Sequence, residues 1–250
     1  MTMPTKAADS AASIRDRIIV ALDVDSAEKA CEITRELAGH VGAFKVGLQL
    51  FSLAGPDFVR ELTADGHKIF LDLKFHDIPN TVAKASVEAA RLGVWMFNVH
   101  AAGGSEMMKR AVEEVNNVCS VEQIARPLMI AVTVLTSSNA GTLREAGFNG
   151  EVDEQVVRLA RLAESAGMDG VVASPLEVTA IRSAVTRTDF LTVTPGIRPQ
   201  TATNDDQKRV TTLRQALAAG SDYAVIGRPI TQAADRLAAV EQIVAECTAN

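Results

Sequence analysis

Short apolar segments alternate with longer amphipathic or alanine-rich segments from one end of the chain to the other. The short segments have the length and composition of buried β-strands, whereas the longer ones have the apolar spacing of helices. The pattern predicts eight strands, over residues 17–23, 43–48, 68–74, 94–100, 127–134, 169–174, 190–194 and 222–227. It predicts eight helices, over residues 26–38, 56–64, 80–92, 104–116, 151–166, 175–185, 211–219 and 230–246.

This repetition of strand and helix predicts the α/β class with a parallel sheet. Eight such units in 250 residues match the size of a closed (β/α)8 TIM barrel. A doubly wound open sheet is the alternative, but no GxGxxG motif follows the first strand. No linker divides the chain, so we predict a flexible N-terminal tail over 1–16 and one barrel domain over 17–250.

Composition narrows the class of protein. Hydrophobic residues make up 47% of the chain and aromatic residues only 4%, which suits a core of Ala, Val, Leu and Ile. The formal net charge of -6 argues against nucleic-acid binding, so an anionic ligand would need a local basic site.

The cysteines and the apolar runs bear on location. Cys31, Cys119 and Cys247 form no CxxC or Cys/His cluster and suit free thiols in a reducing cytoplasm. Residues 1–16 lack the continuous apolar segment of a signal peptide, and no later run approaches the ~18 apolar residues of a membrane span. We therefore expect a cytoplasmic protein with no membrane association.

Unusual polar residues fall near the carboxyl ends of the predicted strands, where barrel enzymes place their reactive groups. They are Asp23, Lys45, Asp72, Lys74, His100, Thr136, Arg198 and Arg228. If the barrel closes, these distant positions converge on one mouth.

The segment IFLDLKFHDIPNT places Asp72, Lys74 and Asp77 within a strongly apolar stretch. Strand alternation predicts that Asp72, Lys74 and His76 share one face. A solvated ion pair on an outer face, worth roughly 0–1 kcal/mol, is one interpretation. However, the run Ile-Phe-Leu before Asp72 is typical of a strand covered on both sides. Burying an ion pair there costs several kcal/mol and indicates a functional site.

The last two strands are followed by candidate phosphate ligands. Gly227 and Arg228 end the last strand, and Pro229 lies near the start of the next helix. Barrel enzymes often bind phosphate there, although a plain turn with a surface charge is the alternative. The loop 196–209 is long enough to be a lid with Arg198 and Gln207 reaching inward, or only a surface loop.

Other catalytic chemistries have weaker signals. The four histidines show no HxH or HExxH spacing, and Lys74 already supplies a positive charge between the two carboxylates of DLKFHD, so we expect no metal. No GxSxG elbow is present for a serine nucleophile. Asp77 has a competing local interpretation, because Asp often begins a helix.

Several of these motifs together resemble the orotidine 5'-monophosphate decarboxylases of the bacterial type. The resemblance covers the whole barrel and is most specific in DLKFHDIPNT. In chain order the motifs are VALD, FKVG, DLKFHDIPNT, NVHAAGG, AVTVLTS, TPGIRP and IGRPIT. It implies a lyase that forms UMP and carbon dioxide, the last step of de novo pyrimidine biosynthesis, without cofactor or metal.

The resemblance also implies a role for each matching residue. Lys74 is the proton donor, and Lys45, Asp72 and Asp77 complete an alternating charge network. Asp77 serves the neighbouring subunit, which implies a homodimer with shared active sites. The implied substrate-binding residues are Asp23, Lys45, Asp72, Ile78, Thr81, Thr136, Arg198, Gln207, Gly227 and Arg228.

Two rival functions stay open at this point. A related sugar-phosphate decarboxylase shares a DxKxxD pattern but uses a divalent metal, and HDIPNT and TPGIRP favour the nucleotide enzyme over it. A non-catalytic nucleotide-binding barrel would keep the phosphate site without needing the charged residues. The roles of His76 and His100 are left open.

Overall fold

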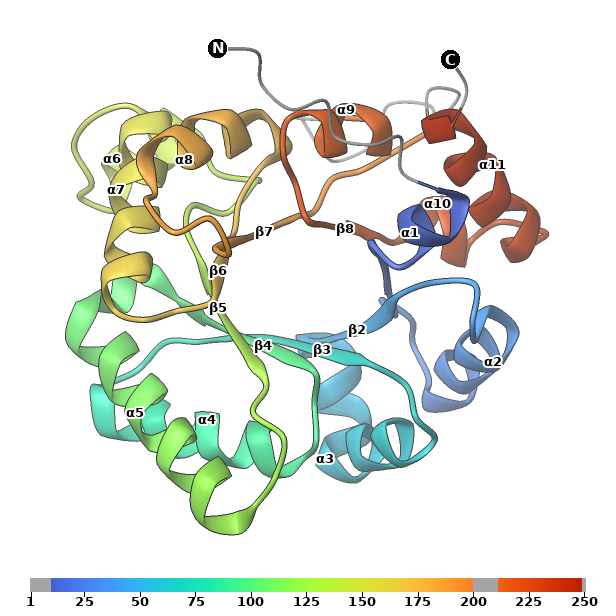
Figure 1. The fold of residues 1–250 in the computed structure, drawn as a ribbon, viewed down its shortest axis with the longest axis horizontal. Coiled ribbons are helices and arrows are strands. Elements are labelled where there is room, and N and C mark those ends of the chain that lie inside the picture. Colours follow the sequence, from blue (N-terminus) through green and yellow to red (C-terminus); the bar gives the residue numbers. More distant parts are fainter. Residues whose placement is uncertain (1–9, 200–210, 249–250) are drawn as a thin grey trace.

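Eight parallel strands close into a barrel in which every strand pairs with its neighbours in sequence and β1 pairs with β8. The computed structural model describes residues 10–199 and 211–248. Figure 1 shows the strands as a central ring with helices around it. The strands are β1 Ile18–Ala21, β2 Ala43–Gly47, β3 Ile69–Phe75, β4 Met96–His100, β5 Leu128–Val132, β6 Gly170–Val172, β7 Leu191–Thr194 and β8 Tyr223–Ile226. The predicted fold class is therefore confirmed.

The helices of the described residues lie outside this ring. They are α1 Ala11–Arg15, α2 Ala27–Leu37, α3 Leu48–Ala64, α4 Pro79–Arg91, α5 Gly104–Glu122, α6 Ala140–Glu145, α7 Val152–Ser165, α8 Val178–Ala184, α9 Leu213–Ala218, α10 Arg228–Thr231 and α11 Arg236–Thr248. Short 3-10 turns precede α5 and α8, at Ala101–Gly103 and Pro175–Glu177.

Local sequence explains several helix boundaries. The side chain of Ser26 accepts a hydrogen bond from the Lys29 N–H and starts α2. Thr212 and Gln215 form a reciprocal capping box at α9. Pro79 stands in the first turn of α4, where a missing N–H costs nothing.

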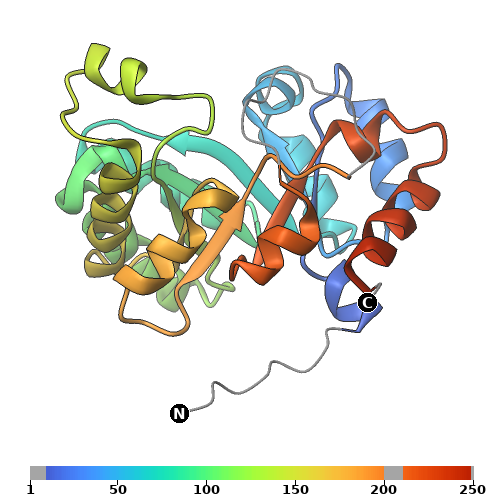
Figure 2. The same cartoon turned by 90° about the horizontal axis from the view of Figure 1, so that it is seen from above.

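Two predicted helices need correction, and one helix of the structure was not predicted. Helix α3 begins at Leu48, not at residue 56, and Gly55 with φ of 74° breaks it into two pieces before Pro56. The predicted helix 230–246 is two helices, α10 and α11. Helix α6 was not predicted, and Figure 2 shows its yellow-green segment projecting beyond the end of the barrel.

Part of the predicted N-terminal tail is folded. Ser10 caps α1, and Ile14 is only 2% exposed. Arg15 in the same helix forms an ion pair with Glu241 of α11 at 2.6 Å. The segment Ala11–Arg15 is therefore helical and packed against α11.

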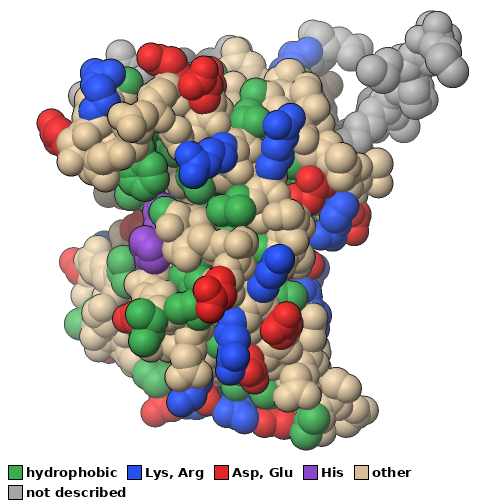
Figure 3. Space-filling view, turned by 90° about the vertical axis from the view of Figure 1, so that its left-hand side faces the viewer, with side chains coloured by type: hydrophobic (Ala, Val, Ile, Leu, Met, Phe, Trp, Pro, Cys, Tyr) green, Lys and Arg blue, Asp and Glu red, His purple; other side chains and the backbone are tan. Residues whose placement is uncertain are grey.

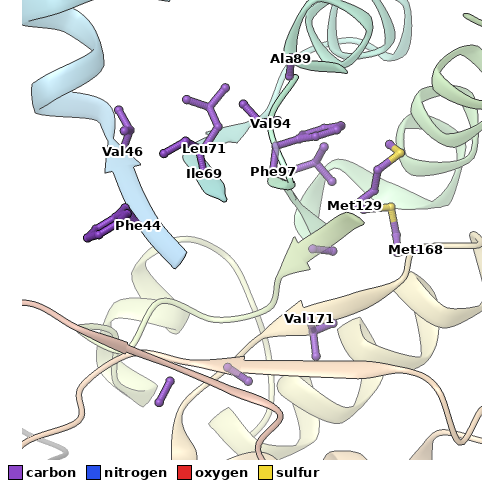
Figure 4. Close-up of a cluster of buried hydrophobic side chains, with 14 of the residues drawn as sticks. Phe44, Val46, Ile69, Leu71, Ala89, Val94, Phe97, Met129, Met168 and Val171 are labelled. Atoms are coloured by element: carbon purple, nitrogen blue, oxygen red, sulfur yellow. The ribbon is translucent and has the colours of Figure 1, made fainter. Parts of the chain in front are cut away.

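The core has two layers. Inside the barrel lies a cluster with Ile19, Phe70, Met96 and Val193, whereas a larger cluster fills the space between the strands and the helices. Figure 4 shows part of the outer layer, in which Phe44, Ile69, Leu71 and Phe97 come from adjacent strands. Strand β3 therefore has apolar side chains on both faces before its charged end, as the sequence predicts.

Within residues 10–199 and 211–248, no helix combines the length and the apolar character that crossing a membrane requires.

The contribution of the outer core layer to stability can be measured by removing the side chain of Phe97. Its side chain is fully buried, so Phe97→Ala should lower the free energy of unfolding by about 3–5 kcal/mol. Phe148→Ala is the matched control, because Phe148 is exposed and should cost well under half as much. Urea unfolding, followed by circular dichroism, measures the free energy of unfolding of both variants. Equal losses of stability would contradict the burial of Phe97 in the outer core layer.

Candidate active site

Four charged side chains meet at the carboxyl ends of the first three strands. Asp23 follows β1, Lys45 lies in β2, and Asp72 and Lys74 lie in β3. The Lys45 Nζ atom is 3.0 Å from Asp23 Oδ1 and 3.4 Å from Asp72 Oδ2. The Lys74 Nζ atom donates to Asp72 Oδ1 at 2.7 Å. The four groups therefore form a continuous row in which acidic and basic charges alternate.

Asp72 lies at the centre of this row and is shielded from water. Its side chain is 13% exposed, compared with 9% for Lys45 and 31% for Lys74. Burial alone raises the pKa of the Asp72 carboxyl, but Lys45, Lys74 and the hydrogen bonds to this group together hold that pKa below its usual value. A solvated pair on an outer face is therefore excluded for Asp72.

The end of β3 departs from regular strand geometry. Leu71 pairs with Phe97 and Phe75 pairs with Val99, so β3 has two more residues than β4 over this interval. Lys74 lies inside the irregular stretch and has φ of 52°, in the left-handed region. That conformation costs a residue other than glycine about 1–2 kcal/mol, so the surrounding contacts must maintain it.

Asn98 of β4 is the functional candidate that the sequence analysis missed. Its side chain accepts a hydrogen bond from the Lys74 backbone N–H at 2.8 Å and donates one to Asp72 Oδ1 at 2.7 Å. A signal was available in the sequence, because Asn98 is an amide in the middle of an apolar strand. Its partners could not be read from the sequence, since they depend on the irregular pairing of β3 with β4.

Gly47 allows the close approach of the Lys45 ammonium. A Cβ atom at Gly47 would lie 2.9 Å from Lys45 Nζ and 3.4 Å from Asp23 Oδ1. Any larger residue would therefore push against the row of charges. This requirement explains the glycine of the FKVG motif.

The charged row forms the floor of a cleft that extends toward the last two strands. One part, of about 430 Å³, is lined by the charged row and, toward the last two strands, by Arg198, Gly227 and Arg228. A smaller apolar part, of about 160 Å³, includes Thr136. Both parts share Lys45, Asp72, Lys74, Pro195 and Val225. The predicted site residues of β1, β2, β3, β5, β7 and β8 are therefore brought together.

The basic end of the cleft is built from the segments after β7 and β8. Arg198 is buried, and its backbone N–H donates to the Thr211 carbonyl at 3.1 Å. Gly227 precedes the first residue of α10, which is Arg228. The predicted lid residue Gln207 lies outside the described residues.

Asp77, Ile78 and Thr81 do not line this cleft. Asp77 Oδ1 accepts a hydrogen bond from the Ile78 N–H at 2.6 Å, while the N-cap position of α4 is Ile78 itself. The alternative that Asp77 is the N-cap of α4 is therefore wrong. Ile78 is 67% exposed, and Thr81 lines a separate groove between α4 and α5.

His76 and His100 stack beside the site, with ring centroids 5.3 Å apart. Burial, followed by the charges of His76 and Lys74, lowers the pKa of His100. We therefore expect the His100 imidazole to be neutral at pH 7. Figure 3 shows histidine side chains in a hollow of one face, close to hydrophobic ones.

The described residues contain no group of three or more His, Cys, Asp and Glu side chains arranged to hold a metal ion. The positive charges beside Asp72 come from Lys45 and Lys74.

Comparisons with known proteins agree with this geometry. The model of the family described as "Orotidine 5'-phosphate decarboxylase / HUMPS family" matches residues 16–243. The orotidine 5'-phosphate decarboxylase of Syntrophotalea carbinolica is 54% identical over 94% of this chain and 96% of its own length. That of Syntrophomonas wolfei is 53% identical over 93% of this chain and 98% of its own length.

A solved structure is similar as well. The crystal structure of orotidine 5'-phosphate decarboxylase from Lactobacillus acidophilus has a TM-score of 0.81 and 42% sequence identity. The match covers 93% of this chain and 99% of that one. The likeness therefore extends over nearly all of both chains.

The lowered pKa of Asp72 predicts a specific dependence of stability on pH. Because the unfolded carboxyl has a pKa near ~3.9 and the folded one lies lower, the unfolded chain binds more protons in the interval between them. The stabilisation from the charged form is thus complete above about pH 4 and is lost as the pH falls through the folded value.

The test compares wild type with Asp72→Asn by urea unfolding between pH 7 and pH 3. The wild type should lose stability relative to the variant only below about pH 4. Asp57→Asn is the control, because Asp57 is exposed on α3. A wild-type loss that begins near neutral pH, or no difference at any pH, would contradict the charged buried Asp72.

Proposed function

This chain belongs to the orotidine 5'-phosphate decarboxylase / HUMPS family, and we propose that it converts orotidine 5'-monophosphate to UMP and carbon dioxide at the cleft described above. This is the last step of UMP biosynthesis. The observation that carries the mechanism is the charged row of Lys45, Asp72 and Lys74 in a cleft that is also lined by two arginines. One end suits a reaction that develops negative charge, and the other suits a phosphate.

The two ends of the cleft orient the substrate. Arg198 and Arg228 provide guanidinium groups for the phosphate dianion, and Gly227 leaves the backbone accessible beside them. Asp23 and Lys45 bind the ribose hydroxyls in the middle. The pyrimidine then enters the smaller apolar part near Thr136.

The reaction requires stabilisation of a carbanion. When the bond between carbon 6 and the carboxylate breaks, carbon dioxide departs and the electron pair stays on carbon 6. The Lys74 ammonium stabilises this charge and then transfers a proton to carbon 6, which yields UMP. The neutral Lys74 amine regains its proton from water.

Asp72 contributes electrostatic stress to the bound substrate. Its charged oxygen next to the substrate carboxylate brings two like charges together, with a repulsion of about 4 kcal/mol at ~4 Å and an effective dielectric constant of about 20. Loss of neutral carbon dioxide relieves that repulsion. Binding of the remote phosphate supplies free energy to hold the substrate there.

Neither a cofactor nor a metal is required in this mechanism. Lys74 supplies both the positive charge and the proton, and Lys45 completes the compensation of Asp72. The rival with a divalent metal needs a Lewis acid at the position that these ammonium groups occupy.

We also propose that the protein functions as a homodimer with shared active sites. Asp77 is exposed and points outside the cleft of its own chain, and the neighbouring Ile78 exposes a large apolar side chain. Both features suit a contact with a second copy, in which Asp77 extends the partner's charge row beyond Lys74. Ile78 and Thr81 then approach the substrate of the partner.

The expected location is the cytoplasm. Cys31, Cys119 and Cys247 are free thiols in the structure, and free thiols are typical of a reducing compartment.

Lys74→Ala tests the proton donor. Loss of the acid and of its charge should lower kcat by ~10⁴-fold or more, since each effect alone is worth at least about 10². UMP should still bind, because Arg198 and Arg228 are intact. The ultraviolet absorbance change of orotidine 5'-monophosphate measures turnover, and calorimetric titration measures UMP binding.

Lys29→Ala on the exposed face of α2 is the control for removal of a lysine. Near-normal turnover by Lys74→Ala would refute the role of Lys74 and favour a different acid. The same assay after exhaustive chelation addresses the metal-dependent rival: activity that disappears and returns with magnesium would overturn the proposed mechanism.

Subunit mixing tests the shared site. Asp23→Ala and Asp77→Ala chains should each be nearly inactive alone, because every site lacks one carboxylate. After random exchange about half of the dimers are mixed, and each has one intact site, so about a quarter of wild-type activity should return. Subunit exchange is verified with two differently tagged chains. Proven exchange with no recovery would contradict shared sites.

A further inference from the structure

The irregular end of β3 leaves a backbone donor without a ladder partner. The β3–β4 pairing goes from Leu71 with Phe97 directly to Phe75 with Val99. Asp72 and Lys74 fall between these pairs, opposite Asn98. In a regular parallel ladder, the backbone carbonyls of β4 would accept the hydrogen bonds of this stretch.

The Asn98 side chain takes over that function. Its Oδ1 atom accepts from the Lys74 N–H at 2.8 Å. Asn98 is 1% exposed, so water does not compete for this hydrogen bond. The left-handed φ of 52° at Lys74 is therefore held by a side-chain carbonyl from the next strand.

The other half of the same amide holds the central carboxylate. The Asn98 Nδ2 atom donates to Asp72 Oδ1 at 2.7 Å, and this oxygen also accepts from Lys74 Nζ. The orientation of the amide is fixed by chemistry, because a backbone N–H can only donate and a carboxylate can only accept. Only a group with both an acceptor and a donor at this position satisfies both neighbours.

We propose that Asn98 is a positioning residue for decarboxylation, which fixes the Lys74 backbone and the Asp72 carboxylate in the geometry required for proton transfer to carbon 6. The proposal rests on the proton-donor role of Lys74 described above. Asn98 is not among the residues that line the cleft, so it acts through its two neighbours.

Asn98→Ala removes both hydrogen bonds. The Lys74 side chain should then sample several positions, and misplacement by about 1 Å is enough to lower kcat by ~10²-fold. Binding of UMP should weaken less than about fivefold, because the phosphate end is unchanged. Ser221→Ala is the matched control: Ser221 is fully buried and bonds to Thr194 at 2.8 Å and to the Tyr223 carbonyl at 2.9 Å, remote from the charged row.

The substitution Asn98→Asp distinguishes an effect on the position of Lys74 and Asp72 from an effect on folding. The new carboxyl can still accept from the Lys74 N–H, but it places a second carboxyl against Asp72, with Lys45 and Lys74 as the facing cations and His100 close by on β4. Two carboxylates in contact cannot both stay ionised easily. At saturating substrate, kcat falls at low pH as the carboxylates become protonated; this fall, the acid limb of the pH profile, should occur about one pH unit or more higher in the variant.

These results decide the proposal. A kcat for Asn98→Ala within threefold of wild type, or no lower than that of Ser221→Ala, overturns it. If Asn98→Ala does not fold, Asn98→Asp decides, and an unchanged acid limb in a folded Asn98→Asp enzyme overturns the proposal. The failure is distinguishable from failure of the proposed function, because Lys74→Ala then still abolishes turnover in the same assay.

Discussion

The ion-paired carboxylate of Asp72 is the interaction on which the site depends. It is buried, and it keeps its charge because two ammonium groups and one amide face its oxygens. Each ammonium is in turn placed by a different strand, so the arrangement exists only when β2 and β3 are paired. Removing one partner leaves the shielded Asp72 charge only partly compensated, which is more costly than breaking a surface pair. The pairing of the strands and the proposed reaction therefore depend on the same atoms, the Asp72 carboxylate oxygens and the groups that face them.

Much of the fold follows from local sequence, because apolar runs of strand length between amphipathic segments leave few alternatives to a parallel barrel. The departures arise where long-range contacts override local signals. Helix α1 is stabilised by its contact with α11, and a second helical piece precedes the break at Gly55, where only the piece after Pro56 was predicted. The charged candidates were predictable since polar groups at strand ends are conspicuous. The function of Asn98 was not, because the register shift between β3 and β4 is a property of the pair.

The cleft separates binding from chemistry. Arg198 and Arg228 follow β7 and β8, whereas the charged row comes from β1, β2 and β3. A rigid barrel fixes the distance between these two groups, so free energy gained at the phosphate can be used to force a carboxylate toward Asp72. In the proposed mechanism the arginines have little direct part in breaking the carbon–carbon bond. They contribute to the rate through the position of the pyrimidine.

Within one chain, the row of alternating acidic and basic side chains ends at the Lys74 ammonium. The row begins at Asp23 and continues through Lys45 and Asp72 to Lys74. The Lys74 side chain is more exposed than that of Lys45. An acidic group from a second copy would complete the alternation and draw the Lys74 ammonium away from Asp72 toward the reacting carbon. In the proposed dimer, association therefore supplies a catalytic charge and not only additional buried area. Activity then becomes linked to subunit concentration, because a monomer retains the phosphate site but lacks the last carboxylate of the row.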